Sequence, residues 1–307
     1  MYLANQGYYM AGKNDSQTND EKNTLKEWLN KEDPITIVTH QKVDADAAFS
    51  AALLKVLRPH AALVFVRADA EIEDERTIAV DLSNGSRAVK GLEVGSAFGL
   101  IVEAMRDIDK PVFKALRRWA KQLNLTDSGK HCHDNVVLAE MVNAWRSLRF
   151  DDNQIVSRAI ELIHGKIRAE KKNLELRTTA KSVSINGGVA VVPQRVRVKA
   201  GHLFKRGAKA VVRQSDCGQS VIISKKMLES GISLQELKPM LPESWFVHPD
   251  GFMACFGSVK APKDYKKSGI HINGLVTIIK TWIKSHENTD LFVNKILATS
   301  TLYDSAK

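Results

Sequence analysis

The fold of the N-terminal half is decided by the stretch Ile35-Thr-Ile-Val-Thr-His40-Gln-Lys-Val-Asp44-Ala-Asp46. Its first four residues are β-branched and follow Pro34, which is typical of a buried strand that begins after a break in the chain. A run rich in Ala and Leu from Asp46 to Leu57 then predicts a helix. The stretch therefore predicts a strand, a polar turn and a helix, the repeating unit of open α/β folds.

The segments that follow continue this alternation. Short buried strands are expected at Leu63–Val66 and Thr77–Val80, and the chain becomes helical after Gly95. Beyond Thr178 the pattern changes to strands and turns. We therefore expect an α/β domain with a mostly parallel sheet and flanking helices, followed by a smaller α+β C-terminal domain.

The turn after the first strand carries the residues best suited to bind metal. His40 ends the strand, and Asp44 and Asp46 lie where the helix begins, so all three should meet at the carboxyl edge of the sheet, where ligand sites of open α/β folds form. Two carboxylates and one imidazole suit manganese or a similar divalent ion. The alternative is that one of the acids only caps the helix N-terminus.

Asp81 directly follows the expected strand Thr77–Val80, so it should lie at the same sheet edge as His40. A carboxylate there can bridge two metal ions about 3.5 to 4 Å apart, the arrangement that activates water in phosphoester hydrolysis. Its alternative role is to form a turn with Ser83-Asn84-Gly85.

These residues match a known pattern. The segment Thr39-His40-Gln-Lys-Val-Asp44-Ala-Asp46-Ala-Ala-Phe-Ser50 resembles the first motif of the DHH phosphoesterase superfamily, and Ala79-Val80-Asp81 is similar to its second. The resemblance implies a manganese-dependent phosphoesterase of the class that includes RecJ-like exonucleases. It also implies that the metal ligands are His40, Asp44, Asp46 and Asp81.

Two later segments resemble the branch of melanocyte-proliferating-gene RNA exonucleases. His133-Asp134-Asn135 precedes a helical stretch as that branch's Asp-Asn motif does, which implies Asp134 as a further ligand. Trp245-Phe-Val-His248-Pro-Asp-Gly251-Phe252 is similar to the branch's C-terminal His-x-x-Gly-Phe segment, which implies that His248 and Gly251 contact the substrate.

The Asp-His-His motif that names the superfamily is missing. It should fall within Leu82-Ser-Asn-Gly-Ser-Arg-Ala-Val-Lys-Gly-Leu-Glu-Val94, which contains no histidine. Either His131 or His133 supplies the imidazole from elsewhere, or these two histidines belong to an exposed polar loop. Without a substitute, the site would lose groups that help to bind a second ion and to stabilise phosphate charge.

The positive charge of the chain is concentrated in its C-terminal part. The net charge is +10, and the segment from Lys181 to His286 holds 17 Lys and Arg against 6 Asp and Glu. Arg195, Arg197 and Lys199 alternate along an expected strand and would project from one face. The expected contacts to nucleic acid are Arg195, Arg197, Lys199, Lys205, Arg206, Arg213, His248 and Gly251. Such a row suits single-stranded nucleic acid, although a solvated basic edge strand would have the same pattern.

Composition and periodicity divide the 307 residues into five parts. We expect a flexible leader over residues 1–20, a DHH-like metal-binding domain over 21–150, a linking helix over 151–180, a basic substrate-binding domain over 181–286 and a tail over 287–307. The sequence has no apolar run of about 18 residues and no signal peptide, which predicts a cytoplasmic protein without membrane association. Its three cysteines are far apart, so neither a disulfide framework nor a Cys-x-x-Cys zinc site is expected.

The sequence thus favours a manganese-dependent exonuclease that acts on single-stranded RNA, DNA or short oligonucleotides. It would use one or two Mn²⁺ ions, with Mg²⁺ as the other candidate, and Asp46, Asp81 and His133 would act in catalysis. The alternative is a catalytically degenerate protein that binds nucleic acid or serves as a subunit of a complex. A protein partner or a homodimer that completes the site stays open.

Overall fold

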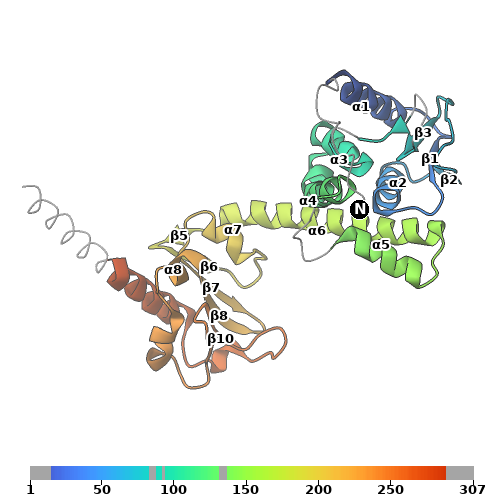
Figure 1. Cartoon of the computed structure of the whole chain (residues 1–307). Coiled ribbons are helices and arrows are strands. Elements are labelled where there is room, and N and C mark those ends of the chain that lie inside the picture. Colours follow the sequence, from blue (N-terminus) through green and yellow to red (C-terminus); the bar gives the residue numbers. More distant parts are fainter. Residues whose placement is uncertain (1–14, 83–87, 92–93, 131–136, 288–307) are drawn as a thin grey trace, which may run out of the picture. The chain divides into compact units, whose positions relative to one another are not determined.

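The computed structural model describes residues 15–82, 88–91, 94–130 and 137–287 (Figure 1). The chain divides into two compact units, Met1–Lys172 and Asn173–Lys307, and the point of division lies inside the long helix α6 (Asp152–Ser182). The first unit contains a parallel sheet with helices and the second contains a separate mixed sheet, so the predicted fold class is confirmed.

The sheet of the first unit has four parallel strands in the order β2-β1-β3-β4. They are β1 (Thr36–His40), β2 (Ala62–Val66), β3 (Thr77–Val80) and β4 (Ala88–Val89). The first three were predicted from their apolar runs, whereas β4 has only two residues and gives no periodic signal. Strands β1 and β3 are neighbours, with Val38 opposite Ala79. Continued by two residues, this register places His40 opposite Asp81.

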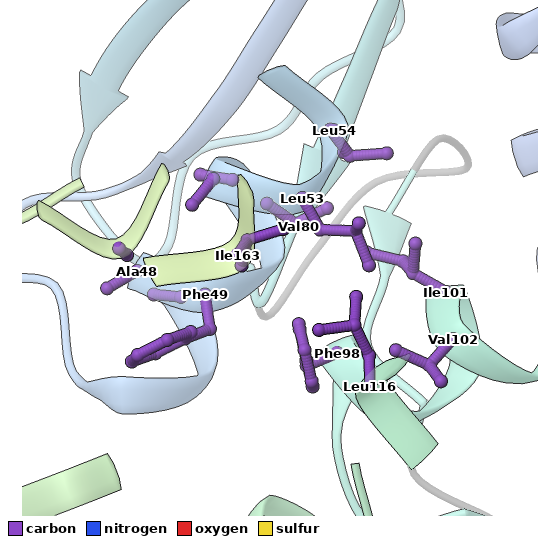
Figure 2. Packing of buried hydrophobic residues seen from close by; sticks show 14 of the residues in the cluster. Ala48, Phe49, Leu53, Leu54, Val80, Phe98, Ile101, Val102, Leu116 and Ile163 are labelled. Carbon is purple, nitrogen blue, oxygen red and sulfur yellow. The ribbon is translucent and has the colours of Figure 1, made fainter. Parts of the chain in front are cut away.

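Helices cover one face of this sheet. They are α1 (Asp15–Leu29), α2 (Ala45–Leu57), α3 (Ala97–Ile108), α4 (Lys110–Asp127), α5 (Leu138–Ser147) and the first half of α6. Successive strand residues point to opposite faces, so Ile37 and Ile78 join the helical core while Val38 and Ala79 form a small cluster on the other face. Figure 2 shows the helical core around Phe49, with residues of α2, α3, α4 and α6 around Val80 of the sheet.

Helix α1 overlaps the segment expected to be a flexible leader. It starts at Asp15, so residues 15–20 of the expected leader are helical, and residues 1–14 lie outside the described part of the chain. The polar composition of this segment hides the helix, because only its last turns carry large apolar residues. Leu25 and Trp28 are buried in the core and hold the helix against the rest of the unit.

The second unit is built on a six-stranded sheet in the order β5-β6-β7-β8-β10-β9. Its strands are β5 (Ile185–Asn186), β6 (Val189–Val192), β7 (Ala210–Ser215), β8 (Gly218–Ile223), β9 (Phe246–Val247) and β10 (Met253–Phe256). Strands β6 and β7 are parallel, and the other pairs are antiparallel. The helical segments are α7 (Ala200–Phe204), α8 (Lys225–Glu229), the 3₁₀ helices η1 (Leu234–Met240) and η2 (Tyr265–Lys267), and a helix over 272–287.

The prediction of a strand at residues 195–199 is wrong. This segment has no ladder partner, because Pro193 ends β6 and both sides of β6 are already paired, with β5 and with β7. Apolar residues still alternate along it, and Val198 is buried in a small cluster beside the sheet. Arg213 donates a hydrogen bond of 2.6 Å to the Val198 carbonyl oxygen, which supplies the partner that a strand would have given.

None of the helices in the described ranges combines the length and the apolar character that crossing a lipid bilayer requires.

Candidate metal centre

Two neighbouring strands bring the first two site residues together. His40 is the last residue of β1 and Asp81 directly follows β3, and His40 Nε2 lies 3.2 Å from Asp81 Oδ2. The buried Thr39 hydroxyl donates to the Val80 carbonyl oxygen at 3.0 Å, which ties the ends of the two strands. The imidazole and the carboxylate are therefore held at the carboxyl edge of the sheet, as predicted from the order of the segments.

Asp44 joins this pair from the start of α2. It is the N-cap of the helix, and its Oδ1 accepts the Ala47 N–H at 3.0 Å. The capping hydrogen bond fixes the side chain while leaving the carboxylate exposed. One ligand atom each from His40, Asp44 and Asp81 lies within 4.8 Å of the other two. Capping and metal binding, set out above as alternatives for this acid, are compatible in the same geometry.

The ring of His40 is oriented for a ligand role. Its Nδ1 lies 2.9 Å from the Gln41 carbonyl oxygen, and because a carbonyl can only accept, we assign the proton to Nδ1. In metal-binding histidines, the ring nitrogen that does not bind the metal usually donates to a carbonyl or carboxylate oxygen, as Nδ1 does here. Nε2 is then the nitrogen that faces Asp81. The hydrogen bond to Asp81 raises the pKa of His40 to about 9 against the opposing effect of burial. Without a metal ion, a proton therefore occupies the position between the two groups.

Asp81 adopts an uncommon backbone conformation. Its φ angle is +53°, in the left-handed region, which costs a residue with a side chain about 1 kcal/mol or more. The Asp81 N–H donates to the Val89 carbonyl oxygen at 3.1 Å, so pairing with β4 stabilises this conformation. Backbone strain of this kind concentrates at functional sites.

Asp46 has a different environment from the other acids. It is only 2% exposed, and its two oxygens accept the backbone N–H groups of Ala97 at 2.7 Å and Phe98 at 2.9 Å, at the start of α3. Burial, and then the negative charge of Asp81, raise the pKa of Asp46 to about 8 despite these hydrogen bonds. The structure uses Asp46 to anchor α3, and its role as a ligand stays a prediction.

A further carboxyl group faces the cluster and was missed in the sequence. Asp127, the last residue of α4, is exposed, yet its pKa is raised to about 6 by partial desolvation of its carboxyl group and by the charges of Asp81 and Asp44. Lys90 opposes this rise. The signal was its position, because a negative charge in the last turn of a helix opposes the helix dipole. His131, His133 and Asp134, the other predicted residues of this site, lie outside the described residues.

The predicted cations of the second unit divide into two groups. Arg206 donates to the carbonyl oxygens of Ala180 and Val183, the latter at 2.7 Å. Arg213 donates to Val198, and burial lowers its pKa. These two guanidinium groups hold the fold together, which a count of charges could not reveal.

The other predicted cations point to solvent. Arg195, Arg197, Lys199 and Lys205 are exposed, and Lys199 Nζ donates to Asn173 Oδ1 at 3.0 Å. In the described part of the chain, neither Arg195 nor Arg197 has a hydrogen-bond or ion-pair partner. Arg206 is exposed as well, but its guanidinium group is engaged by backbone carbonyl oxygens, so fewer of the predicted cations are available to a ligand than the sequence suggests.

His248 and Gly251 lie in one tight turn between β9 and β10. The His248 ring packs on Phe252 with 4.2 Å between ring centroids, and its Nδ1 accepts the Asp250 N–H at 3.2 Å. Gly251 has φ of +70°, and a Cβ there would lie 1.7 Å from Ser233 Oγ, so only glycine fits. The turn presents a half-buried imidazole beside an aromatic ring.

Comparisons with known proteins give structural likenesses only. Neither a family model nor a curated protein matches the chain. A pGpG-specific phosphodiesterase from Vibrio cholerae is similar at 12% identity and a TM-score of 0.29, covering 82% of this chain and 98% of that one. RecJ in complex with Mg²⁺ from Thermus thermophilus is similar at 12% identity and a TM-score of 0.26, with 89% of this chain covering about half (52%) of RecJ.

The DHH domain of a member of a family of ribosomal proteins is similar at 11% identity and a TM-score of 0.29, covering 89% of this chain and 92% of that one. The description of this last protein names a DHH domain. With TM-scores below 0.3, the matched proteins carry no argument about the site, and its chemistry follows from its own residues.

Proposed function

We propose that the first unit binds a divalent metal ion through His40, Asp44 and Asp81 and that the protein is a metal-dependent phosphoesterase. The observation that carries the proposal is the convergence of these three ligand atoms, within 4.8 Å of one another at the carboxyl edge of a parallel sheet. Two acids and an imidazole in such proximity would repel or hold a proton unless a cation lay between them.

The donor set supports a hard or borderline divalent ion. One imidazole nitrogen and two carboxylate oxygens suit Mn²⁺ and accommodate Mg²⁺, and among the described residues no cysteine joins this group. When bound, such an ion lowers the pKa of a water molecule and stabilises negative charge on phosphate oxygens. The chain itself keeps His40 Nε2 directed at Asp81 through the Gln41 carbonyl, and keeps Asp44 in place through the α2 cap.

We propose single-stranded RNA, DNA or a short oligonucleotide as the substrate. Exposed Arg195 and Arg197 can neutralise phosphates, and the ring pair of His248 and Phe252 can stack against a base. In this proposal the metal-binding domain spans residues 21–150, the basic domain spans 181–286, and the enzyme works in the cytoplasm. The described cysteines, Cys217 and Cys255, are free thiols, which is consistent with a reducing compartment.

A second candidate function is nucleic acid binding without catalysis. Two observations favour it. Asp46 is occupied by the N-terminus of α3, and the interval 82–94 supplies no histidine in place of the missing Asp-His-His motif. A site of three ligands can hold one ion, whereas two-ion hydrolysis needs more donors.

The deciding experiment is incubation of the purified chain with end-labelled single-stranded RNA and DNA, with Mn²⁺, with Mg²⁺ or with chelator. The matched variant is Asp81→Asn, because asparagine tolerates the left-handed backbone of this position and removes only the charge. Metal-dependent shortening that the variant lacks would support the phosphoesterase. Salt-sensitive binding without cleavage by the wild-type chain would support the second candidate instead.

A further inference from the structure

The loop between His40 and Asp44, here called the ligand loop (residues 41–44), has an uncommon backbone. Lys42 adopts φ of +54° although it carries a side chain, and the next residue, Val43, is fully buried in the core. Because His40 lies directly before this loop and Asp44 ends it, the loop conformation sets the separation of two proposed metal ligands.

A residue far along the chain fixes this conformation. The carboxylate of Asp152 accepts the Lys42 N–H at 2.8 Å through Oδ2 and the Val43 N–H at 3.0 Å through Oδ1. Two successive backbone N–H groups form a concave anion-binding surface, and Asp152 fills it. The contact uses both oxygens of the carboxylate on the ligand loop.

Asp152 is not required to cap its own helix. The neighbouring Asp151 does so, since its Oδ1 accepts the Gln154 N–H at 2.8 Å and its own N–H donates to Gln154 Oε1 at 2.9 Å. The first turns of α6 are anchored by the buried residues Ile155 and Val156. Asp152 therefore reaches the loop from a rigid support.

Arg146 of α5 also holds the ligand loop. Its Nη2 donates to the Val43 carbonyl oxygen and lies 3.7 Å from Asp152 Oδ1. The N–H and the carbonyl of Val43 are thus both held by charged side chains, one acidic and one basic. Such charge-assisted hydrogen bonds are shorter and stronger than those between neutral groups.

We infer that Asp152 is a positioning residue that, with Arg146, holds the ligand loop in the conformation that brings His40 and Asp44 together to bind the metal ion. This inference rests on the proposed metal site. Asp152 touches neither the ion nor the substrate in this scheme and acts only through the backbone of Lys42 and Val43. Outer contacts of this kind change metal affinity by about 10- to 100-fold in other proteins.

The test is titration of Mn²⁺ into the full chain by calorimetry, with the electron paramagnetic resonance spectrum of bound Mn²⁺ as a second readout. Asp152→Asn should weaken binding about tenfold and broaden the spectrum, because an amide presents one acceptor where two N–H groups point. Asp151→Asn is the matched control. It removes the same charge from the adjacent residue, and its affinity should stay within about twofold of the wild-type value.

The outcomes separate the two levels of the proposal. If the wild-type chain binds Mn²⁺ and Asp152→Asn binds it equally well, the positioning role is wrong and the metal site stands. If the folded wild-type chain binds no Mn²⁺, the proposed function fails and this inference with it. Should Asp152→Asn not fold by circular dichroism, Arg146→Gln decides, since a loss of about threefold or more supports the role and an unchanged affinity overturns it.

Discussion

The candidate metal site of the first unit (His40, Asp44 and Asp81) and the basic surface of the second unit differ in how their charged side chains are paired. In the metal site, Asp44 and Asp81 converge on His40, and the ion pairs found among the described residues give neither acid a lysine or arginine. On the basic surface, the guanidinium groups of Arg206 and Arg213 donate hydrogen bonds to backbone carbonyl oxygens. In the first site two acids share one imidazole as their only described partner of opposite charge, whereas in the second site backbone carbonyl oxygens engage part of the positive charge.

The difference teaches that residue type alone does not tell a functional charge from a structural one. Asp46 resembles Asp44 in sequence, yet it is buried on two N–H groups of α3. Arg206 resembles Arg195 in charge, yet it is fixed on the end of α6. What decides in each case is whether backbone groups have already used the hydrogen-bonding capacity of the side chain.

The largest expected effect comes from removing the negative charges of Asp44 and Asp81. Asp44→Asn combined with Asp81→Asn should weaken Mn²⁺ binding at least about 100-fold and abolish hydrolysis, since both negative ligands are lost. Asparagine can still cap α2 and tolerates the left-handed backbone at position 81, so the fold should persist. Calorimetry with Mn²⁺ and a cleavage assay measure the two effects.

The same double variant should bind single-stranded RNA in chelator as the wild-type chain does, within about twofold, because the basic surface carries that affinity. A loss of RNA affinity comparable to the loss of Mn²⁺ affinity would show that the two regions are not separate in function.

Much of the fold could be predicted because its main strands are short apolar runs. The run 35–38 and the run 77–80 each lead into a polar ligand residue, and this order alone placed His40 and Asp81 at one edge. The sequence failed where an element depends on its partners. Strand β4 has two residues, and the segment 195–199 alternates like a strand but has no neighbour to pair with.

The candidate site could be predicted only in its side-chain pattern. The convergence of His40, Asp44 and Asp81 could be predicted because their residue types and their places at the ends of two strands and the start of a helix are visible in the sequence. The structural role of Asp46 and the grip of Asp152 on the ligand loop could not be found, because their partners are backbone N–H groups far along the chain. Every residue but proline has such a group, so the sequence carries no mark of the contact.

Asp46→Ala provides a test of the distinction between structural and ligand acids. It leaves two buried N–H groups without an acceptor, and we expect it to destabilise the protein by about 2 to 4 kcal/mol in urea unfolding. Ser50→Ala is the control, because its hydroxyl donates to Asp46 only at 3.4 Å and its loss should cost less than about 1 kcal/mol. If Asp46→Ala kept full stability while losing Mn²⁺ affinity, Asp46 would be a ligand, and the distinction between it and Asp44 would be wrong.

Substitutions of the solvent-directed arginines and of an arginine bonded to backbone carbonyls should likewise have different effects, the first on RNA binding and the second on stability. Arg195→Ala with Arg197→Ala should weaken single-stranded RNA binding about tenfold and reduce the slope of log K against log salt by about 1.4, because two phosphate contacts on a single strand are lost. Arg206→Ala should leave this slope unchanged and lower stability by about 1 to 2 kcal/mol through the lost carbonyl contacts. Fluorescence anisotropy at several salt concentrations measures the slope, and a slope that falls only in Arg206→Ala would reverse the assignment.

The smallest expected effect on stability concerns Glu236, an acid of the second unit whose carboxylate accepts three hydrogen bonds. Glu236 accepts the Ser233 N–H at 3.1 Å, Trp282 Nε1 at 3.1 Å and His286 Nε2 at 2.8 Å. Burial alone would raise the pKa of Glu236, but these hydrogen bonds and the charge of His286 outweigh it, so the pKa lies below its usual value of 4.5.

An acid whose pKa is lower in the folded than in the unfolded protein contributes stability above pH 4.5 and loses it as the pH falls through the folded value. Glu236→Gln keeps the capping geometry and removes the charge, so we expect it to cost about 1 kcal/mol or less at pH 7 and nothing near pH 3. Urea unfolding followed by tryptophan fluorescence at both pH values measures the difference. If the difference in unfolding free energy between wild type and variant increased toward acid pH, the fold would not stabilise the charge of Glu236. Glu236 would then no longer serve as the structural acid with which Asp44 and Asp81 are compared.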